Sequence, residues 1–135
     1  MRLSKKLTAD ELRCLHELLV QDFVRYPAAD DIKTLIVETS AARANLRGTG
    51  RRAFIFVIED IGYCGTAGCL MLIGERRPDG KCHILTAANA DGGEVTVLAR
   101  RDHGYRRLYA PCELYFDGRQ YLQVREACPN AVVRR

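Results

Sequence analysis

Two apolar runs and the loop between them decide the fold of this chain: Phe54-Ile-Phe-Val-Ile58, Cys64-Gly-Thr-Ala-Gly-Cys69 and Leu70-Met-Leu-Ile73. Apolar runs of this length, bounded by glycines, are typical of strands. Facing residues of neighbouring antiparallel strands lie about 4.5 to 5.5 Å apart at Cα, a separation that suits a disulfide. We therefore predict two strands joined by a tight loop, with a structural disulfide between Cys64 and Cys69 as the favoured state.

Other states of this cysteine pair stay open. The thiols could remain reduced, or they could form a redox pair, although redox enzymes usually place the reactive cysteine of a C-x-x-C motif at a helix N-terminus. A zinc set that adds Cys82 and His83 is disfavoured, because neighbouring residues of a strand point to opposite faces. We expect no metal and no cofactor.

The flanking sequence extends the hairpin into an α+β fold. Thr8-Ala-Asp-Glu11 is a capping box, and the leucines that follow recur at helical spacing until Pro27 ends the helix. Apolar segments between turn residues mark the candidate strands: 33–38, 53–59, 69–75, 82–87, 94–99, 105–109, 114–116 and 121–124. We predict an N-terminal helix packed on an antiparallel meander of six or seven strands.

Length and charge limit the function classes. The 135 residues fit a single globular domain, residues 1–135. The net charge of +4 rests on 17 arginines and 4 lysines, with Arg-Arg pairs at 51/52, 76/77, 100/101, 106/107 and 134/135. In a strand each pair splits between two faces, so we expect no specific nucleic-acid partner. The apolar runs are shorter than the roughly 20 residues of a membrane span, so we expect no transmembrane segment.

Four further cysteines stand at positions 14, 82, 112 and 128. Cys14 lies on the flank of the predicted helix, and we interpret it as a small half-buried residue. Four cysteines allow three complete pairings. We predict a bridge between Cys82 and Cys112, because both flank strands of the same predicted sheet.

The candidate site lies at the loop end of the hairpin. The sequence contains no nucleophile elbow, no His-Glu-x-x-His motif, no phosphate-binding glycine loop and no dinucleotide fingerprint, so no catalytic residue is assigned. Glu59 and Asp60 end a strong strand beside the cysteine loop, while His103-Gly-Tyr105 is predicted to be a turn. The predicted binding residues are Glu59, Asp60, Tyr63, Gly65, Thr66 and Gly68.

Two short motifs carry a resemblance: Tyr63-Cys-Gly-x-x-Gly-Cys69 and Phe116-Asp-Gly-Arg-Gln-Tyr121. They resemble small bacterial envelope domains of uncharacterised function that carry a Cys-Gly-x-x-Gly-Cys hairpin. In those domains the turn before the first strand is commonly acidic, whereas Arg47 stands here, and a cation at that position argues against calcium. The resemblance implies an exported domain, periplasmic or lipid-anchored, with an oxidised cysteine pair. The chain as given shows no signal peptide, so a cytoplasmic location is the alternative.

Two functional classes follow. The first is a non-catalytic binding module of the envelope, such as an inhibitor or immunity protein, which presents the rigid loop from Gly62 to Cys69 to a protein partner. A disulfide-held loop suits this role because it loses little entropy on binding. The alternative is a thiol-dependent enzyme or redox protein that uses Cys64 or Cys69, with His83 or His103 brought near by folding.

Overall fold

A computed structural model describes residues 3–22, 36, 38–48, 52–59, 63–65, 68–90, 95–110 and 113–124. Within these ranges the elements follow in this order: α1 (Ala9–Asp22), β1 (Thr39–Ala44), β2 (Ala53–Ile58), β3 (Cys64–Gly65), β4 (Gly68–Arg76), β5 (Cys82–Ala90), β6 (Thr96–Asp102), β7 (Tyr105–Tyr109), β8 (Glu113–Phe116) and β9 (Tyr121–Gln123).

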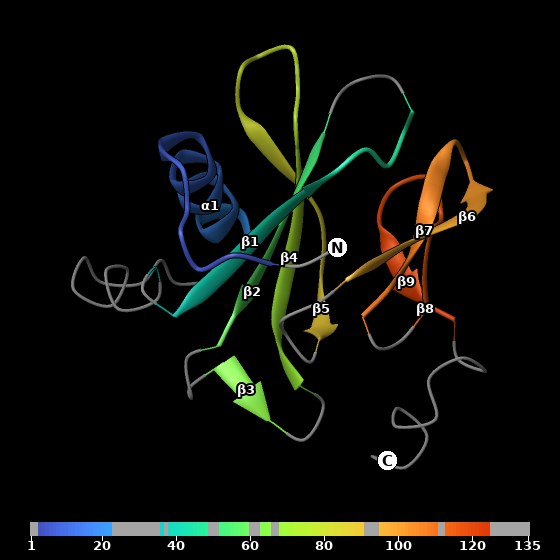
Figure 1. The fold of residues 1–135 in the computed structure, drawn as a ribbon. Coiled ribbons are helices and arrows are strands. Elements are labelled where there is room, and N and C mark those ends of the chain that lie inside the picture. Colours follow the sequence, from blue (N-terminus) through green and yellow to red (C-terminus); the bar gives the residue numbers. More distant parts are fainter. Residues whose placement is uncertain are drawn as a thin grey trace.

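The strands of the described residues form two antiparallel sheets (Figure 1). In the first, β1, β2 and β4 lie in that order, β5 pairs with the other edge of β4, and β3 continues the line of β2 along β4. The second sheet has the order β6-β7-β8-β9. The α+β class is confirmed. The predicted single meander of six or seven strands is wrong, because the chain begins a second sheet after β5.

Burial of both faces of the first sheet explains the second sheet. All six residues of β2 are buried, as expected of a strand between two layers. Ile55 and Val57 belong to a core shared with the second sheet. Phe54 and Phe56 belong to a core shared with α1, which lies on the opposite face. A single meander with one helix would leave one of these apolar faces in water.

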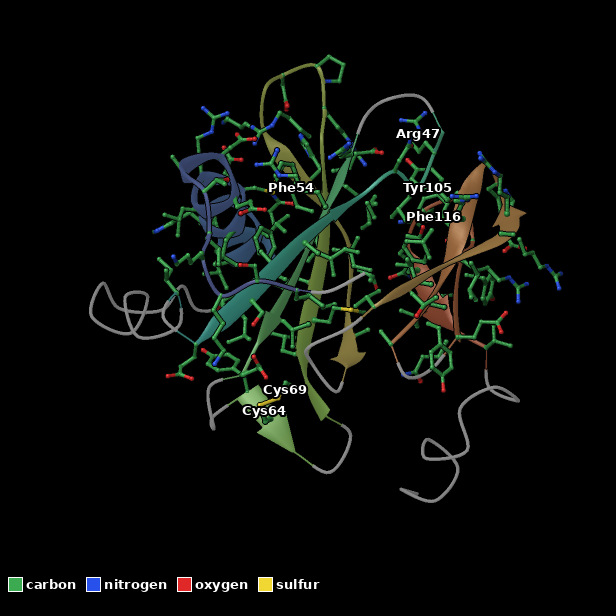
Figure 2. The ribbon with its side chains drawn as sticks, viewed as in Figure 1. Arg47, Phe54, Cys64, Cys69, Tyr105 and Phe116 are labelled. Atoms are coloured by element: carbon green, nitrogen blue, oxygen red, sulfur yellow. A yellow bond between two sulfur atoms is a disulfide. The ribbon has the colours of Figure 1, made fainter. Side chains whose placement is uncertain are left out.

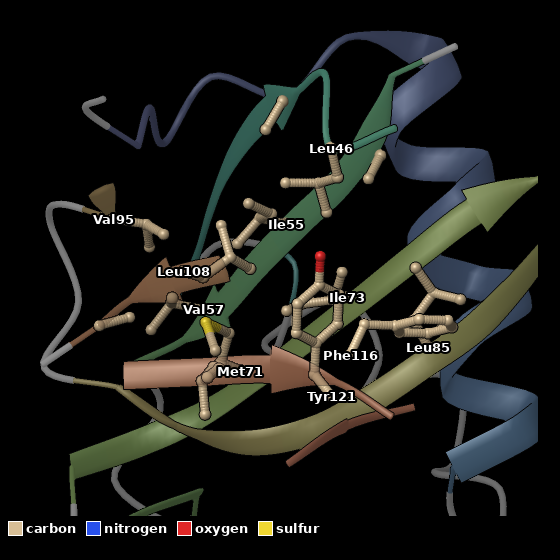
Figure 3. Packing of buried hydrophobic residues seen from close by; sticks show 14 residues of the cluster. Leu46, Ile55, Val57, Met71, Ile73, Leu85, Val95, Leu108, Phe116 and Tyr121 are labelled. Carbon is tan, nitrogen blue, oxygen red and sulfur yellow. The ribbon is translucent and has the colours of Figure 1, made fainter. Parts of the chain in front are cut away.

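Side chains from both sheets interlock in the core between them (Figure 3). Met71 and Ile73 of the first sheet and Leu108 of the second are fully buried there. At one end of this core the Phe116 and Tyr121 rings meet edge to face, with centroids 5.4 Å apart. The Tyr121 hydroxyl donates to the Arg106 carbonyl at 2.8 Å, and burial raises the pKa of this phenol. The core therefore joins the sheets without a buried unpaired hydroxyl at this point.

The helix begins as its capping box predicts. The Thr8 amide donates to Glu11 at 2.8 Å, and the Glu11 amide donates to the Thr8 hydroxyl at 3.1 Å. Leu15 and Leu18 are fully buried against the first sheet. The described helix runs to Asp22, and the predicted stop at Pro27 lies outside the described residues.

The first strand lies later in the chain than predicted. Residues 33–35 and 37 are outside the described residues, Ile36 and Glu38 are not in a strand, and β1 comprises Thr39–Ala44. Its Thr-Ser-Ala-Ala-Arg-Ala sequence is weak by strand propensity, but six residues pair with β2 in register. Tertiary pairing therefore decides this strand. The other predicted strands match the observed ones to within a few residues, and 105–109 coincides with β7.

Candidate functional site: a disulfide-closed hairpin

The predicted disulfide between Cys64 and Cys69 is present at the lower end of the first sheet in Figure 2. The two residues are direct partners across β3 and β4, with Cα atoms 3.9 Å apart. Gly65 pairs with Gly68 one step further out, and Gly68 has φ of 103°, which glycine adopts without strain. The bridge thus closes a narrow antiparallel hairpin at its base.

The hairpin is an extension of a central strand. Cys69 pairs with Cys64 on one edge of β4 and with Ala90 of β5 on the other. Its side chain packs against the core between the sheets, on the same side of β4 as Met71, which is fully buried. The bridge therefore connects the short β3 to β4, a strand that is paired along both of its edges.

The structure describes four of the six predicted binding residues, Glu59, Tyr63, Gly65 and Gly68. The Glu59 carboxylate accepts a hydrogen bond from the Ser40 hydroxyl at 3.0 Å, and its amide donates to the Glu38 carbonyl, so this residue is tied to β1. Tyr63 is partly buried against the core beneath α1. Gly65 and Gly68 lie in the hairpin itself. Asp60 and Thr66, with Gly62 of the predicted loop, lie outside the described residues.

A second disulfide joins Cys14 of α1 to Cys82 at the start of β5. The predicted bridge between Cys82 and Cys112 is therefore wrong, and Cys112 lies outside the described residues. The interpretation of Cys14 as a half-buried residue is also wrong, because Cys14 and Cys82 are both fully buried. The start of β5 faces the helix, so its cysteine meets a helical partner. The signal in the sequence was the spacing to Leu18, which lies four positions after Cys14, on the same side of the helix, and is also fully buried.

Side chains of α1 reinforce this connection along the edge of β5. The Cys82 amide donates to the Glu17 carboxylate at 2.9 Å. Gln21 donates to the Cys82 carbonyl at 2.7 Å and accepts from the Ile84 amide at 2.8 Å. These three hydrogen bonds occupy edge groups that would otherwise be open to another strand. The helix is thus attached to the sheet by a disulfide and by edge pairing.

The histidines considered for thiol chemistry lie away from the hairpin. His83 pairs with Glu75 on β4, six positions from Cys69, which is about 20 Å along a strand. It lies 2.8 Å from the Asp79 carboxylate. His103 occupies the turn between β6 and β7. His83 is therefore not placed to activate either sulfur of the hairpin.

The cysteines and histidine of the considered zinc set are also separated. Cys82 is bonded to Cys14, whereas Cys64 and Cys69 are bonded to each other. In the described ranges no three His, Cys, Asp or Glu side chains gather as metal ligands would.

No protein-family model, curated protein or solved structure matches this chain. Within the residues that the structure describes, no helix has the length and apolar character needed to cross a membrane. The two disulfides indicate that the protein folds in an oxidising compartment, because structural disulfides are rare in a reducing cytosol.

Proposed function

We propose that this protein is a non-catalytic binding module of the bacterial envelope, periplasmic or lipid-anchored, which presents its β3–β4 hairpin to a protein partner. The observation that carries the proposal is the bridge between the directly paired Cys64 and Cys69. A hairpin closed in this way loses little conformational entropy on binding, so more of its contact energy contributes to affinity.

The shape of the hairpin favours insertion into a cleft. Beyond the bridge, Gly65 stands opposite Gly68, and neither residue has a side chain to keep a partner's surface away from the backbone. The base of the hairpin is held by Cys69 in the core between the sheets. A narrow, anchored protrusion suits an inhibitor of a wall-degrading enzyme or an immunity protein that neutralises a toxin.

The envelope location rests on two supports. The first is the pair of disulfides, one of which is fully buried between α1 and β5. The second is the resemblance of the Tyr63 to Cys69 motif to bacterial envelope domains.

The test is affinity capture from an envelope extract of the bacterium that encodes the chain, read by quantitative mass spectrometry. Wild-type protein is compared with a Cys64→Ala/Cys69→Ala variant, which opens the hairpin, and with Gly68→Ala, which strains the turn at φ 103° while leaving the bridge in place. We expect a specific partner on the wild-type protein and at least a tenfold weaker signal on both variants.

A matched control is the Cys14→Ala/Cys82→Ala variant, which removes the other disulfide and leaves the hairpin closed. Circular dichroism establishes that each bait is folded before capture. Partners retained equally by the opened and closed hairpins would contradict the proposal. Catalysis of disulfide exchange by the wild-type protein, abolished by Cys64→Ala/Cys69→Ala, would instead establish the thiol-dependent alternative.

A further inference from the structure

A recess of about 510 Å³ lies at the end of the molecule opposite the hairpin, where Figure 2 shows Arg47, Tyr105 and Phe116 far from Cys64 and Cys69. It is lined by residues of three turns and the strands beside them: Arg77, His103, Tyr105, Phe116, Gly118 and Arg119. We propose that this recess binds a small anion through a phosphate or carboxylate group. The inference is independent of the proposed role of the hairpin.

Two arginines give the lining of the recess a positive charge. Arg77 follows β4, and Arg119 lies in the turn between β8 and β9. Among the residues that the structure describes, no carboxylate forms an ion pair with either guanidinium. Guanidinium groups match phosphate and carboxylate geometry with two parallel donors, so the pair offers directed hydrogen bonds to an anion.

The nearby carboxylates are already engaged. The Glu75 side chain is only 5% exposed, accepts from the Tyr105 hydroxyl at 3.1 Å and lies 3.6 Å from the Arg47 guanidinium. The Asp117 carboxylate accepts a hydrogen bond from the backbone amide of Arg119 at 2.8 Å. Hydrogen bonds from the Gln120 and Arg119 amides hold the pKa of Asp117 below its usual value. The charge of Arg119 also helps to lower the pKa of Asp117, so this carboxylate offsets part of the Arg119 charge and leaves Arg77 as the more available guanidinium.

The aromatic residues that line the recess pack against each other and against Arg47. The Tyr105 and Phe116 rings lie 4.0 Å apart, and the Arg47 guanidinium lies 5.3 Å from the Tyr105 ring centre. The Tyr105 hydroxyl donates a hydrogen bond to the Glu75 carboxylate, which holds the ring in place. Burial, and then the negative charge of Glu75, raise the pKa of the Tyr105 phenol, so it remains a neutral donor at physiological pH.

The wall formed by His103 has an uncommon backbone. His103 has φ of 52° and Gly118 has φ of 107°, both in the region that favours glycine. A Cβ atom on Gly118 would lie 3.6 Å from the His103 ring, so the imidazole packs directly over the glycine backbone. Asp102 precedes His103, and its carboxylate accepts a hydrogen bond from the Arg107 guanidinium at 2.7 Å. His103 and Gly104 are the two central residues of the β6–β7 hairpin turn, which requires a positive φ at both positions, and this turn places the imidazole at the recess.

The experiment is a nitrogen-15 NMR titration with sodium phosphate and, separately, sodium acetate, at ionic strength held constant with chloride. We expect saturable amide shifts at His103, Gly118 and Arg119, with a dissociation constant on the order of 1 mM for phosphate. The acetate arm distinguishes a carboxylate ligand from a phosphate ligand by which anion binds more tightly.

Arg77→Gln/Arg119→Gln is the test variant, and Arg13→Gln is the matched control, because Arg13 is 62% exposed on α1, on the other side of the first sheet. We expect the double variant to weaken binding at least tenfold and the control to leave it within twofold. Shifts that grow linearly without saturation, or binding that survives the double variant, would overturn the proposal. Equal weakening by Arg13→Gln would overturn it too, because it would indicate diffuse attraction to net positive charge.

Discussion

The two disulfides should differ in what they contribute to stability, and removing each as a pair measures the difference. Cys14→Ala/Cys82→Ala removes the bridge between α1 and β5, and Cys64→Ala/Cys69→Ala removes the bridge in the hairpin. Alanine at both positions of a pair avoids a leftover thiol that could mispair. Each variant therefore reports on one bridge alone.

The magnitudes follow from the lengths of the closed loops. The bridge between α1 and β5 spans a sequence separation of 68, and the hairpin bridge spans 5. The entropy that each bridge removes from the unfolded chain corresponds to about 4 kcal/mol for the long loop and about 2 kcal/mol for the short one. A domain of ordinary stability has about 5 to 15 kcal/mol in total, so the first loss is a large share of it.

Urea unfolding followed by circular dichroism measures both values on the oxidised proteins. We expect the Cys14→Ala/Cys82→Ala variant to lose about 2 kcal/mol more than the Cys64→Ala/Cys69→Ala variant. The wild-type protein under reducing conditions should lose at least as much as the less stable variant. Equal losses, or a larger loss on opening the hairpin, would refute the reasoning that loop length decides the contribution.

Three further substitutions test the packing and the charges. Gly74→Ala should cost about 1 to 3 kcal/mol, because its Cβ would lie 2.6 Å from the Leu18 methyls, and Leu18→Ala in the same chain should relieve part of that cost. Gln21→Ala should cost about 2 kcal/mol by releasing two edge hydrogen bonds, whereas the neighbouring, 58% exposed Val20→Ala should change stability by less than about 0.5 kcal/mol. Thermal and urea unfolding measure these differences. If the effects of Gly74→Ala and Leu18→Ala on the free energy of unfolding were additive, that result would contradict a contact between the two positions. The hydrogen bond from Arg107 lowers the pKa of Asp102 below 3.8, so its stabilisation is complete well above pH 3.8 and is lost as the pH falls through the folded-state value. The stability gap between wild type and Asp102→Asn should therefore close on acidification, and a gap independent of pH would argue against this ion pair.

Local signals are sufficient to predict several elements. The capping box at Thr8 and Glu11 forms with both of its hydrogen bonds, because its partners are three residues apart. The hairpin bridge is equally local, since Cys64 and Cys69 are separated by only 5 positions in the sequence. In both cases short-range geometry leaves few alternatives.

Non-local contacts account for the errors. The division into two sheets depends on which faces of β2 and β4 are covered, and no short window of sequence contains that information. The partner of Cys82 is 68 residues away on a helix, so the cysteine spacing alone does not identify it. The sequence does not predict the recess for the same reason, because its lining residues Arg77, His103 and Arg119 come from three separate turns.

The most direct test of the central claim, a disulfide-closed module of an oxidising compartment, is peptide mapping of the protein purified from its own cells. Free thiols are alkylated at lysis, and linked peptides are identified by mass spectrometry without reduction. We expect a Cys64–Cys69 linkage and a Cys14–Cys82 linkage, with no alkylation at these four positions. Alkylated thiols at Cys64 and Cys69 in the freshly lysed cells would contradict the account.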